Sequence, residues 1–430
     1  MNSQVSSATI SSVISNAWLA SRIVNPTAAE AFTHMGLPHA KHEEYRHTPI
    51  TRILEKTFDF SIITNPPSAV NDLTPFSIQG VDTNRLVLIN GQFSEKHSSV
   101  TNTSVEVKSM LRAWVENKQD IVKHLSQYAD FRQDALVAWN TAGWMDGIFI
   151  KVPDHTEMAD PIVIHHIHDA SAGEVKTVSR NLILVGSSSK ISVIEKFDST
   201  GAHPHFSNVV TEALVEKHAT LDFFSLQADT GARYHFGHTQ FWQHQASKIN
   251  NYVFALDGRF IRNNTQMAID GENCDSHLYG LYLLCNSTLV DNHTVVDHRK
   301  PNSFSNELYK GILEDQAKGV FNGKIFVRPD AQKTNAFQSN RNILLSDKAT
   351  INTKPQLEIW ADDVKCSHGC TTGQLDEEAI FYLRSRGISK ETARAMVLYA
   401  FASELLETIT NPVLRNYIDC LISERLHKTF

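Results

Sequence analysis

Short runs of β-branched and aromatic residues dominate the middle of the chain, from about residue 148 onward. The runs stand close together, turn residues separate them, and apolar residues rarely recur every three or four positions. This pattern is typical of an all-β architecture rather than of helices. The runs expected to form strands are residues 148–152, 162–167, 182–185, 191–194, 221–226, 252–255, 278–284, 325–327 and 343–345.

Three segments of this zone share a loose repeat that bears on the kind of β architecture. Residues 217–222 (KHATLD), 315–320 (DQAKGV) and 347–352 (DKATIN) each contain an alanine near a charged residue, followed by apolar and polar positions. Small residues at regular corners favour a parallel β-helix, in which successive coils stack around a shared core. The spacing is imperfect, so the pattern by itself leaves a β-sandwich open.

Helical patterns flank the β zone on both sides. Residues 15–32 and 109–128 carry apolar residues on one helical face. We therefore expect a mainly β protein in three parts, with an N-terminal helical or mixed domain over residues 1–135, a β core over 136–373 and a C-terminal helical domain over 374–430.

The C-terminal part contains clear signals for where its helices begin and end. Asp376, Ser389 and Asn411 stand where N-caps are expected, and Pro412 follows at a first helical position. Gly387 is a typical helix stop. The apolar stripes of these helices fit a small bundle packed on the β core, a partner-binding module, or both.

Two thiols and an imidazole lie within five residues at the end of the β zone. On a strand, Cys366, His368 and Cys370 would all point to one face. Such soft ligands suit iron, zinc or sulfur chemistry, although a single buried cysteine more often serves as a small apolar residue. A closed structural zinc site needs four ligands, and the sequence has no second pair. An incomplete site shared with a partner chain is the better interpretation.

Composition and charge exclude several classes of protein. The formal charge of −7, without a basic run, argues against a nucleic-acid binder. Five unevenly spaced cysteines do not form a disulfide framework. No apolar run reaches membrane-spanning length, and residues 1–15 lack the pattern of a secretory signal. We expect a protein of the reducing cytoplasm, with no membrane partner.

Other polar motifs resemble known sites without matching them. Residues 42–47 (HEEYRH) have one residue too many for the zinc motif H-E-x-x-H, so the two histidines lie on different helix faces. Residues 291–298 (DNHTVVDH) favour a polar sheet surface or a dimer seam over a metal site. Neighbours on a strand face opposite sides, so Asp362 and Asp363 are expected to serve a turn or a cap.

Seven segments in the C-terminal half resemble the SufD branch of the SufB/SufD family of iron-sulfur cluster assembly proteins. They occur in the family's order and lie densely between about residues 290 and 400, whereas resemblance upstream is thinner. The segments are residues 306–313, 320–325, 331–336, 342–346, 353–359, 361–369 and 381–388.

The resemblance implies a fold, two partners and a role. The fold would be a right-handed parallel β-helix flanked by helical parts. Such proteins pair with SufB through their β-helices and dock SufC, an ABC-type ATPase, on their C-terminal helices. The chain has no Gly-rich P-loop, which agrees with ATP being used only through SufC and with a non-catalytic scaffold. The resemblance leaves open a reduced flavin on the complex and a homodimer when SufB is absent.

The resemblance also ranks the site residues. SufB-like chains usually carry a sulfur-accepting cysteine in the segment matching residues 337–341, where this chain has Ser339 and Asn340. SufD-like chains place the matching histidine near the SufB interface, so His368 is the first candidate ligand of a transient Fe-S cluster and Cys366 the second. Cys370 stands where the family often has alanine, which predicts a dispensable side chain.

One alternative function and three further cysteines complete the sequence-based expectations. A self-contained metal- or thiol-dependent enzyme would use Cys366 and His368 as nucleophile and base, but same-face neighbours on a strand lie about 6–7 Å apart at the backbone. Cys274, Cys285 and Cys420 stand in apolar settings, so we expect them in the core.

Overall fold

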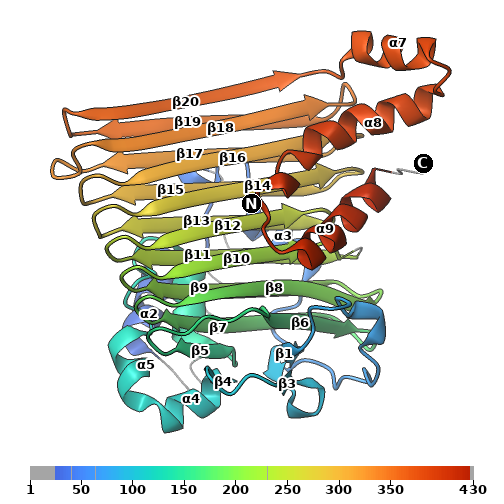
Figure 1. Ribbon diagram of the computed structural model, residues 1–430. Helices are drawn as coiled ribbons and strands as arrows, with labels where there is room; N and C mark the ends of the chain where they lie inside the picture. The colour runs from blue at the N-terminus through green and yellow to red at the C-terminus, as the bar shows by residue number, and fades with distance from the viewer. Residues whose placement is uncertain (1–24, 40, 63, 230, 427–430) are drawn as a thin grey trace.

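The computed structural model describes residues 25–39, 41–62, 64–229 and 231–426. Within these residues the chain forms two sheets that stack into a parallel β-helix (Figure 1). The first sheet contains β1 (Asn84–Ile89), β2 (Gln92–Phe93), β3 (Ser99–Val100), β6 (Ile162–Ala170), β8 (Lys190–Gly201), β10 (Thr220–Gln227), β12 (Lys248–Ala255), β14 (Asp275–Leu284), β16 (Phe304–Leu313), β18 (Thr334–Leu344) and β20 (Val364–Gly373).

The second sheet holds the intervening strands. These are β4 (Glu106–Ser109), β5 (Ile148–Val152), β7 (Val175–Val185), β9 (His205–Val215), β11 (Arg233–Gln243), β13 (Phe260–Ile269), β15 (Leu289–His298), β17 (Lys318–Val327) and β19 (Thr350–Ile359). From β5 onward the chain crosses from one sheet to the other after every strand, so each strand pairs in parallel with the strand two places along. The strands before β5 pair antiparallel with one another or with β5, and β1 also pairs in parallel with β6. This confirms the predicted mainly β, parallel β-helix architecture and excludes the sandwich.

Inward-facing apolar side chains build the core of the solenoid. Ile191, Leu221 and Ile249 are register partners on three neighbouring strands, and all three are fully buried. The alanines of the loose sequence repeat, Ala219 and Ala317, are also fully buried. Larger side chains would not fit where the chain turns a corner this tightly, which explains why alanine recurs there.

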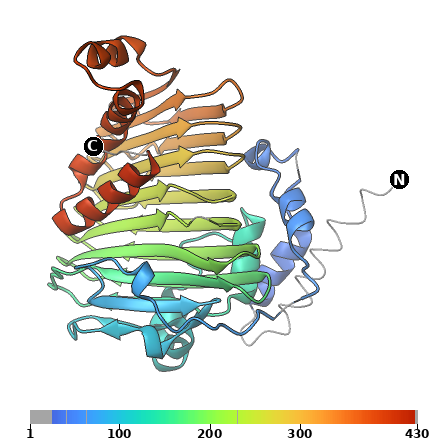
Figure 2. The ribbon, with the colours of Figure 1, turned by 90° about the vertical axis from the view of Figure 1, so that its right-hand side faces the viewer.

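Helices cover the outer faces of both sheets (Figure 2). The N-terminal helices pack on the second sheet, where Trp139 stacks on Phe206 with ring centroids 5.6 Å apart. The C-terminal helices pack on the first sheet, where the Tyr252 hydroxyl donates to the Thr408 carbonyl at 2.9 Å. The helices and short 3-10 turns are α2 (Pro26–Met35), η1 (Glu43–Tyr45), α3 (Ile50–Thr57), η2 (Thr74–Phe76), η3 (Glu95–His97), α4 (Met110–Glu116), α5 (Lys118–His124), α6 (Ala135–Gly143), α7 (Glu377–Ser385), α8 (Lys390–Ser403), η4 (Leu406–Thr408) and α9 (Pro412–Arg425).

The predicted starts of the C-terminal helices are correct. The side chains of Asp376, Ser389 and Asn411 each accept a hydrogen bond from a backbone N–H in the first turn of α7, α8 and α9. Gly387 has a φ of 88°, the left-handed conformation expected after a helix end.

The predicted N-terminal helices need correction. The expected helix over residues 109–128 is two shorter ones, α4 and α5, which meet at Asn117 with a φ of −115°. Residues 15–24 of the other expected helix lie outside the described residues, and α2 begins at Pro26, after the Asn25 N-cap. In the part of the chain that the structure describes, no helix combines the length and apolarity needed to cross a membrane.

Candidate functional site

The strand β20 carries the thiols and the imidazole predicted from the sequence, at one end of the solenoid (Figure 1). Cys366, His368 and Cys370 lie at alternate positions of this strand and so share one face. Cys366 is half-buried beside its register partner Ala336 and packs on the solenoid core, whereas His368 and Cys370 are exposed. The ligand-bearing face is therefore the inward face of the final coil.

The environment of Cys366 keeps its thiol neutral. Burial raises the pKa of the Cys366 thiol above its ordinary value, and a hydrogen bond from the Ala336 backbone opposes this effect only in part. The thiolate is the form that binds metal. Cys366 therefore needs a bound cation, or a positive group from another molecule, before it can act as a ligand.

The candidate ligands do not form a complete site within this chain. Across residues 25–426, leaving aside positions 40, 63 and 230, no group of three or more His, Cys, Asp or Glu side chains is placed to hold a metal ion. The two-residue separation of Cys366 and His368 on an extended strand also disfavours a nucleophile–base pair. Among the described residues, Cys366 and His368 therefore form at most part of a metal site.

Two buried polar residues, which sequence reasoning missed, lie behind His368. Gln338 on β18 is the register partner of His368, and Glu307 on β16 is the register partner of Gln338. The Gln338 amide donates to the Glu307 carboxylate at 2.7 Å, and both side chains are buried. Burial raises the pKa of Glu307 to about 7. Their signal in the sequence is weak. Until the register between the strands is known, nothing shows that these polar residues face the solenoid interior.

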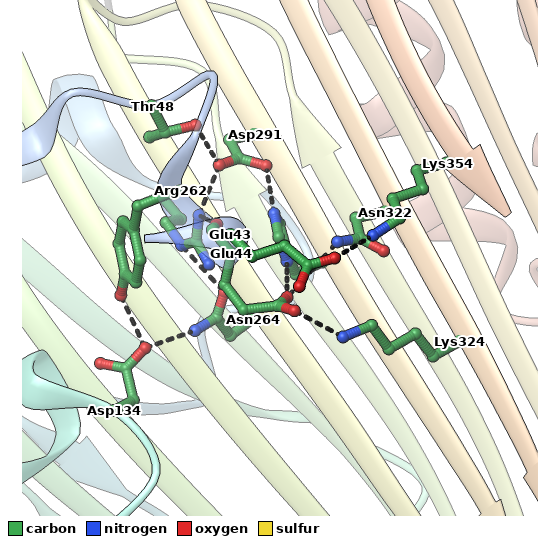
Figure 3. Close-up of polar contacts among 12 residues, drawn as sticks. Glu43, Glu44, Thr48, Asp134, Arg262, Asn264, Asp291, Asn322, Lys324 and Lys354 are labelled. Carbon is green, nitrogen blue, oxygen red and sulfur yellow. Dashed lines mark hydrogen bonds and ion pairs between the residues drawn. The ribbon is translucent and has the colours of Figure 1, made fainter. Parts of the chain in front are cut away.

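A second polar cluster fixes the N-terminal segment to the outer face of the second sheet (Figure 3). Glu44 accepts from Lys324 at 2.6 Å and lies 3.3 Å from the Nδ1 atom of His293. These contacts, that of His293 foremost, hold the pKa of the Glu44 carboxyl far below its usual range. Residues of β15 and β17 thus bind the short turn that contains Glu44.

The centre of this cluster is a buried ion pair between Arg262 and Asp291. The Arg262 guanidinium donates to Asp291 at 2.6 Å and lies 3.8 Å from the ring centroid of Tyr45. The Thr48 hydroxyl also donates to Asp291. Burial favours the neutral carboxyl, but His293 and Arg262 outweigh burial and lower the pKa of Asp291 to about 2. The fully buried aspartate is therefore charged and paired.

This cluster shows the structural role of two motifs that the sequence left ambiguous. Residues 291–298 form part of a polar sheet face, as predicted, and Asp297 binds Arg299 and Arg328 there. The near-match to a zinc helix at residues 42–47 includes only a three-residue 3-10 turn, whose glutamate Glu44 binds Lys324. The segment serves docking rather than metal binding.

The predicted core cysteines are only partly correct. Cys274 is buried, as expected. Cys420 is exposed, because it lies on the outward side of α9 rather than on the stripe that packs against the sheet. Cys285 is half-buried just beyond β14, and its sulfur accepts a hydrogen bond from Arg425 at 2.8 Å.

Large apolar side chains are exposed at two places near the ligand-bearing end. Phe337, Ile359 and Trp360 are 37%, 39% and 49% exposed on the last coils. Phe381 and Tyr382 on α7 are 74% and 58% exposed. Figure 1 shows α7 standing beyond the end of the solenoid, next to β20 in the chain. Exposed apolar groups of this size are typical of interaction surfaces.

The fold and the site define a class: a parallel β-helix protein with an incomplete soft-ligand face on its last strand. Two family models match the chain, the SufBD protein N-terminal region over residues 8–164 and the SUF system FeS cluster assembly SufBD core domain over residues 166–401. The chain belongs to the SufBD family of SUF-system iron-sulfur cluster assembly proteins. This confirms the resemblance identified from the sequence motifs.

Relatives of this chain carry matching descriptions. It is 31% identical over 393 residues to the iron-sulfur cluster assembly protein SufD of Escherichia coli, covering 91% of this chain and 90% of the relative. It is 31% identical over 392 residues to an iron-sulfur cluster assembly SufBD family protein of Synechocystis sp., covering 89% and 86%. SufD of Bacillus subtilis is 26% identical over 292 residues, covering 64% and 63%.

Proposed function

We propose that this chain is a non-catalytic, SufD-like subunit that helps to build nascent Fe-S clusters with SufB and SufC in the cytoplasm. The observation that carries the proposal is the face of β20 that bears only two candidate ligands, His368 and Cys366, two residues apart on the last strand of the first sheet. A site that needs ligands from a second molecule suits a shared assembly centre better than a self-contained enzyme.

The edge formed by β19 and β20 supports pairing with SufB. Among the described strands, each of these two ends its sheet, so each has one side without a strand partner. An unpaired strand edge is a natural surface for adding another chain. Phe337, Ile359 and Trp360 add apolar area beside it. In the absence of SufB, the same edge would support a homodimer.

The C-terminal helices support docking of SufC. Helices α8 and α9 bury their apolar stripes against the first sheet, but α7 keeps Phe381 and Tyr382 in solvent. A rigid base that carries an exposed aromatic pair is well suited to hold an ATPase subunit. ATP would then act through SufC, and any reduced flavin would belong to the assembled complex.

The chemistry at β20 would begin when SufB supplies the missing ligands. The His368 imidazole is exposed and can bind iron through a neutral ring nitrogen. Cys366 would lose its proton as the cation binds, because binding offsets the burial that keeps the thiol neutral. Cys370 is exposed one further step along the same face and is not required by this scheme.

Anaerobic cluster formation by the co-expressed subunits tests this proposal. We expect His368→Ala to abolish most of the cluster and Cys366→Ala to reduce it, with the three-subunit complex still assembled. Cys370→Ala, on the same face, is the matched control and should retain its cluster. Full cluster content in both His368→Ala and Cys366→Ala would reduce this chain to a structural partner and refute the assigned ligands.

A further inference from the structure

Three polar residues stand in one row across the last strands of the first sheet. Glu307, Gln338 and His368 are successive register partners on β16, β18 and β20, and they occupy inward-facing positions. Register partners on parallel strands lie about 4.8 Å apart, which places each side chain of the row within reach of the next. The row joins the solenoid interior to the exposed imidazole.

The Gln338 side chain is held in a defined place within this row. Its Nε2 atom donates to Glu307 Oε2 at 2.7 Å, and the residue is 3% exposed. A Cβ atom added to Gly323 would lie 2.3 Å from the same nitrogen, so the missing side chain at Gly323 makes room for the amide. Gly323, on a strand of the opposite sheet, therefore leaves room for the Gln338 amide beside its register partner Glu307.

The other end of the Gln338 amide has no partner. Its Oε1 atom is buried and accepts no hydrogen bond within the described chain. Above its pKa of about 7, Glu307 is ionised and can only accept hydrogen bonds. It then holds the NH2 group of the Gln338 amide toward itself and leaves the amide carbonyl oxygen free. A buried acceptor without a donor is costly, which makes the neighbouring imidazole its natural donor.

We propose that Glu307 and Gln338 are positioning residues for His368. Glu307 fixes the orientation of the Gln338 amide, and the Gln338 carbonyl, which has no partner among the described residues, accepts a hydrogen bond from one ring N–H of His368 when the exposed imidazole turns inward. The other ring nitrogen is then free for iron. Histidines that bind metals commonly donate their second N–H to such an acceptor, which fixes the tautomer. The role of iron rests on the proposed function, but the hydrogen-bond row does not.

Nitrogen NMR of histidine-labelled protein tests the row without any partner subunit. At pH 8, with Glu307 ionised, we expect the His368 ring to favour one tautomer, and the His368→Gln variant identifies its signals among the other histidines. Gln338→Met keeps the length of the side chain but removes the acceptor. The tautomer ratio of His368 should then change about fivefold, the factor that a typical net hydrogen bond supplies.

A second variant and a control keep the test decisive. Glu307→Gln removes the obligate acceptor, so the Gln338 amide can adopt either orientation and the His368 tautomers should become mixed. Ser339→Ala changes the same strand on its outward side and should leave the ratio as in the unchanged protein. An identical ratio in the unchanged protein, Gln338→Met and Glu307→Gln would overturn the proposal. Because no cluster is involved, a failure of the proposed function would not produce that result.

Discussion

Glu307 is an acidic side chain in a place that excludes solvent. It is 1% exposed, and burial raises its pKa to about 7. The folded protein therefore binds this proton more tightly than the unfolded chain does. Between about pH 4.5 and pH 7 the folded state holds more protons, so its stability falls as the pH rises through this range.

Replacement of Glu307 by glutamine should stabilise the protein in a pH-dependent way. Gln has the shape of the neutral acid, and the Gln338 amide can turn to pair with it. At pH 8 we expect Glu307→Gln to raise the free energy of unfolding by roughly 3 kcal/mol, from a pKa difference of about 2.5 units. At pH 5 the gain should fall to about 1 kcal/mol or less, because most of the carboxyl is then protonated in the folded protein. Urea unfolding at both pH values measures the gain, and an equal gain at both would contradict the buried carboxylate.

The N-terminal segment and the second sheet show how elements far apart in the sequence become one unit. Glu44 and Thr48 meet residues of β13, β15 and β17 that follow them by more than 200 positions. These ion pairs and hydrogen bonds add to the apolar packing of the same segment on the second sheet, and their defined geometry specifies one docked position. The segment thus braces the outer face of the solenoid.

Removal of the central carboxylate should loosen this docked segment. Asp291→Ala leaves the Arg262 guanidinium, itself 1% exposed, without its buried counter-ion. We expect a loss of roughly 3–5 kcal/mol in the free energy of unfolding, the usual cost of an uncompensated buried charge. Chemical denaturation measures this loss, and hydrogen exchange at residues 43–48 should rise with it.

A neighbouring ion pair provides the control for that experiment. The Glu43 side chain is 75% exposed and binds Lys354 at 2.6 Å, also at the surface. Exposed ion pairs contribute little to stability, so Glu43→Gln should have nearly the same free energy of unfolding as the unchanged protein. An equal loss of the free energy of unfolding in Asp291→Ala and Glu43→Gln would mean that burial does not determine how much each ion pair stabilises the protein.

At the scale of the whole molecule, the two exposed apolar surfaces are separate. The edge residues Phe337, Ile359 and Trp360 belong to the last coils, and Phe381 and Tyr382 belong to α7. Both lie at the ligand-bearing end, so two partners bound there would flank the strand that carries His368. If SufC docks on α7 as proposed, its movements would act close to the proposed cluster site.

Charged substitutions should separate the two proposed partners. Trp360→Glu places a charge on the edge surface and should abolish co-purification with SufB while SufC remains bound. Phe381→Asp should have the opposite effect, because α7 contributes nothing to the sheet edge. Each variant is the control for the other. Loss of both partners in either variant, with the fold intact by circular dichroism, would show that the surfaces do not act separately.

Much of the fold could be predicted from the sequence because its signals are local. Asp376, Ser389 and Asn411 cap their helices through contacts with residues two or three positions away, so the local sequence is enough to place the helix starts. The alanines of the corner repeat are small because the coil turns there. Strands such as β11 and β13 escaped prediction because histidine, arginine and asparagine fill positions that tertiary contacts bury.

The sequence by itself determined the strand-rich core, the caps of the C-terminal helices and the common face of Cys366, His368 and Cys370, because each depends on residues close together in the chain. Only the tertiary structure decided that Glu307 and Gln338 stand behind His368, and that Glu44 meets Lys324. Those contacts depend on the register between strands about 30 residues apart or on docking across the chain. Local spacing carries no information on such distances.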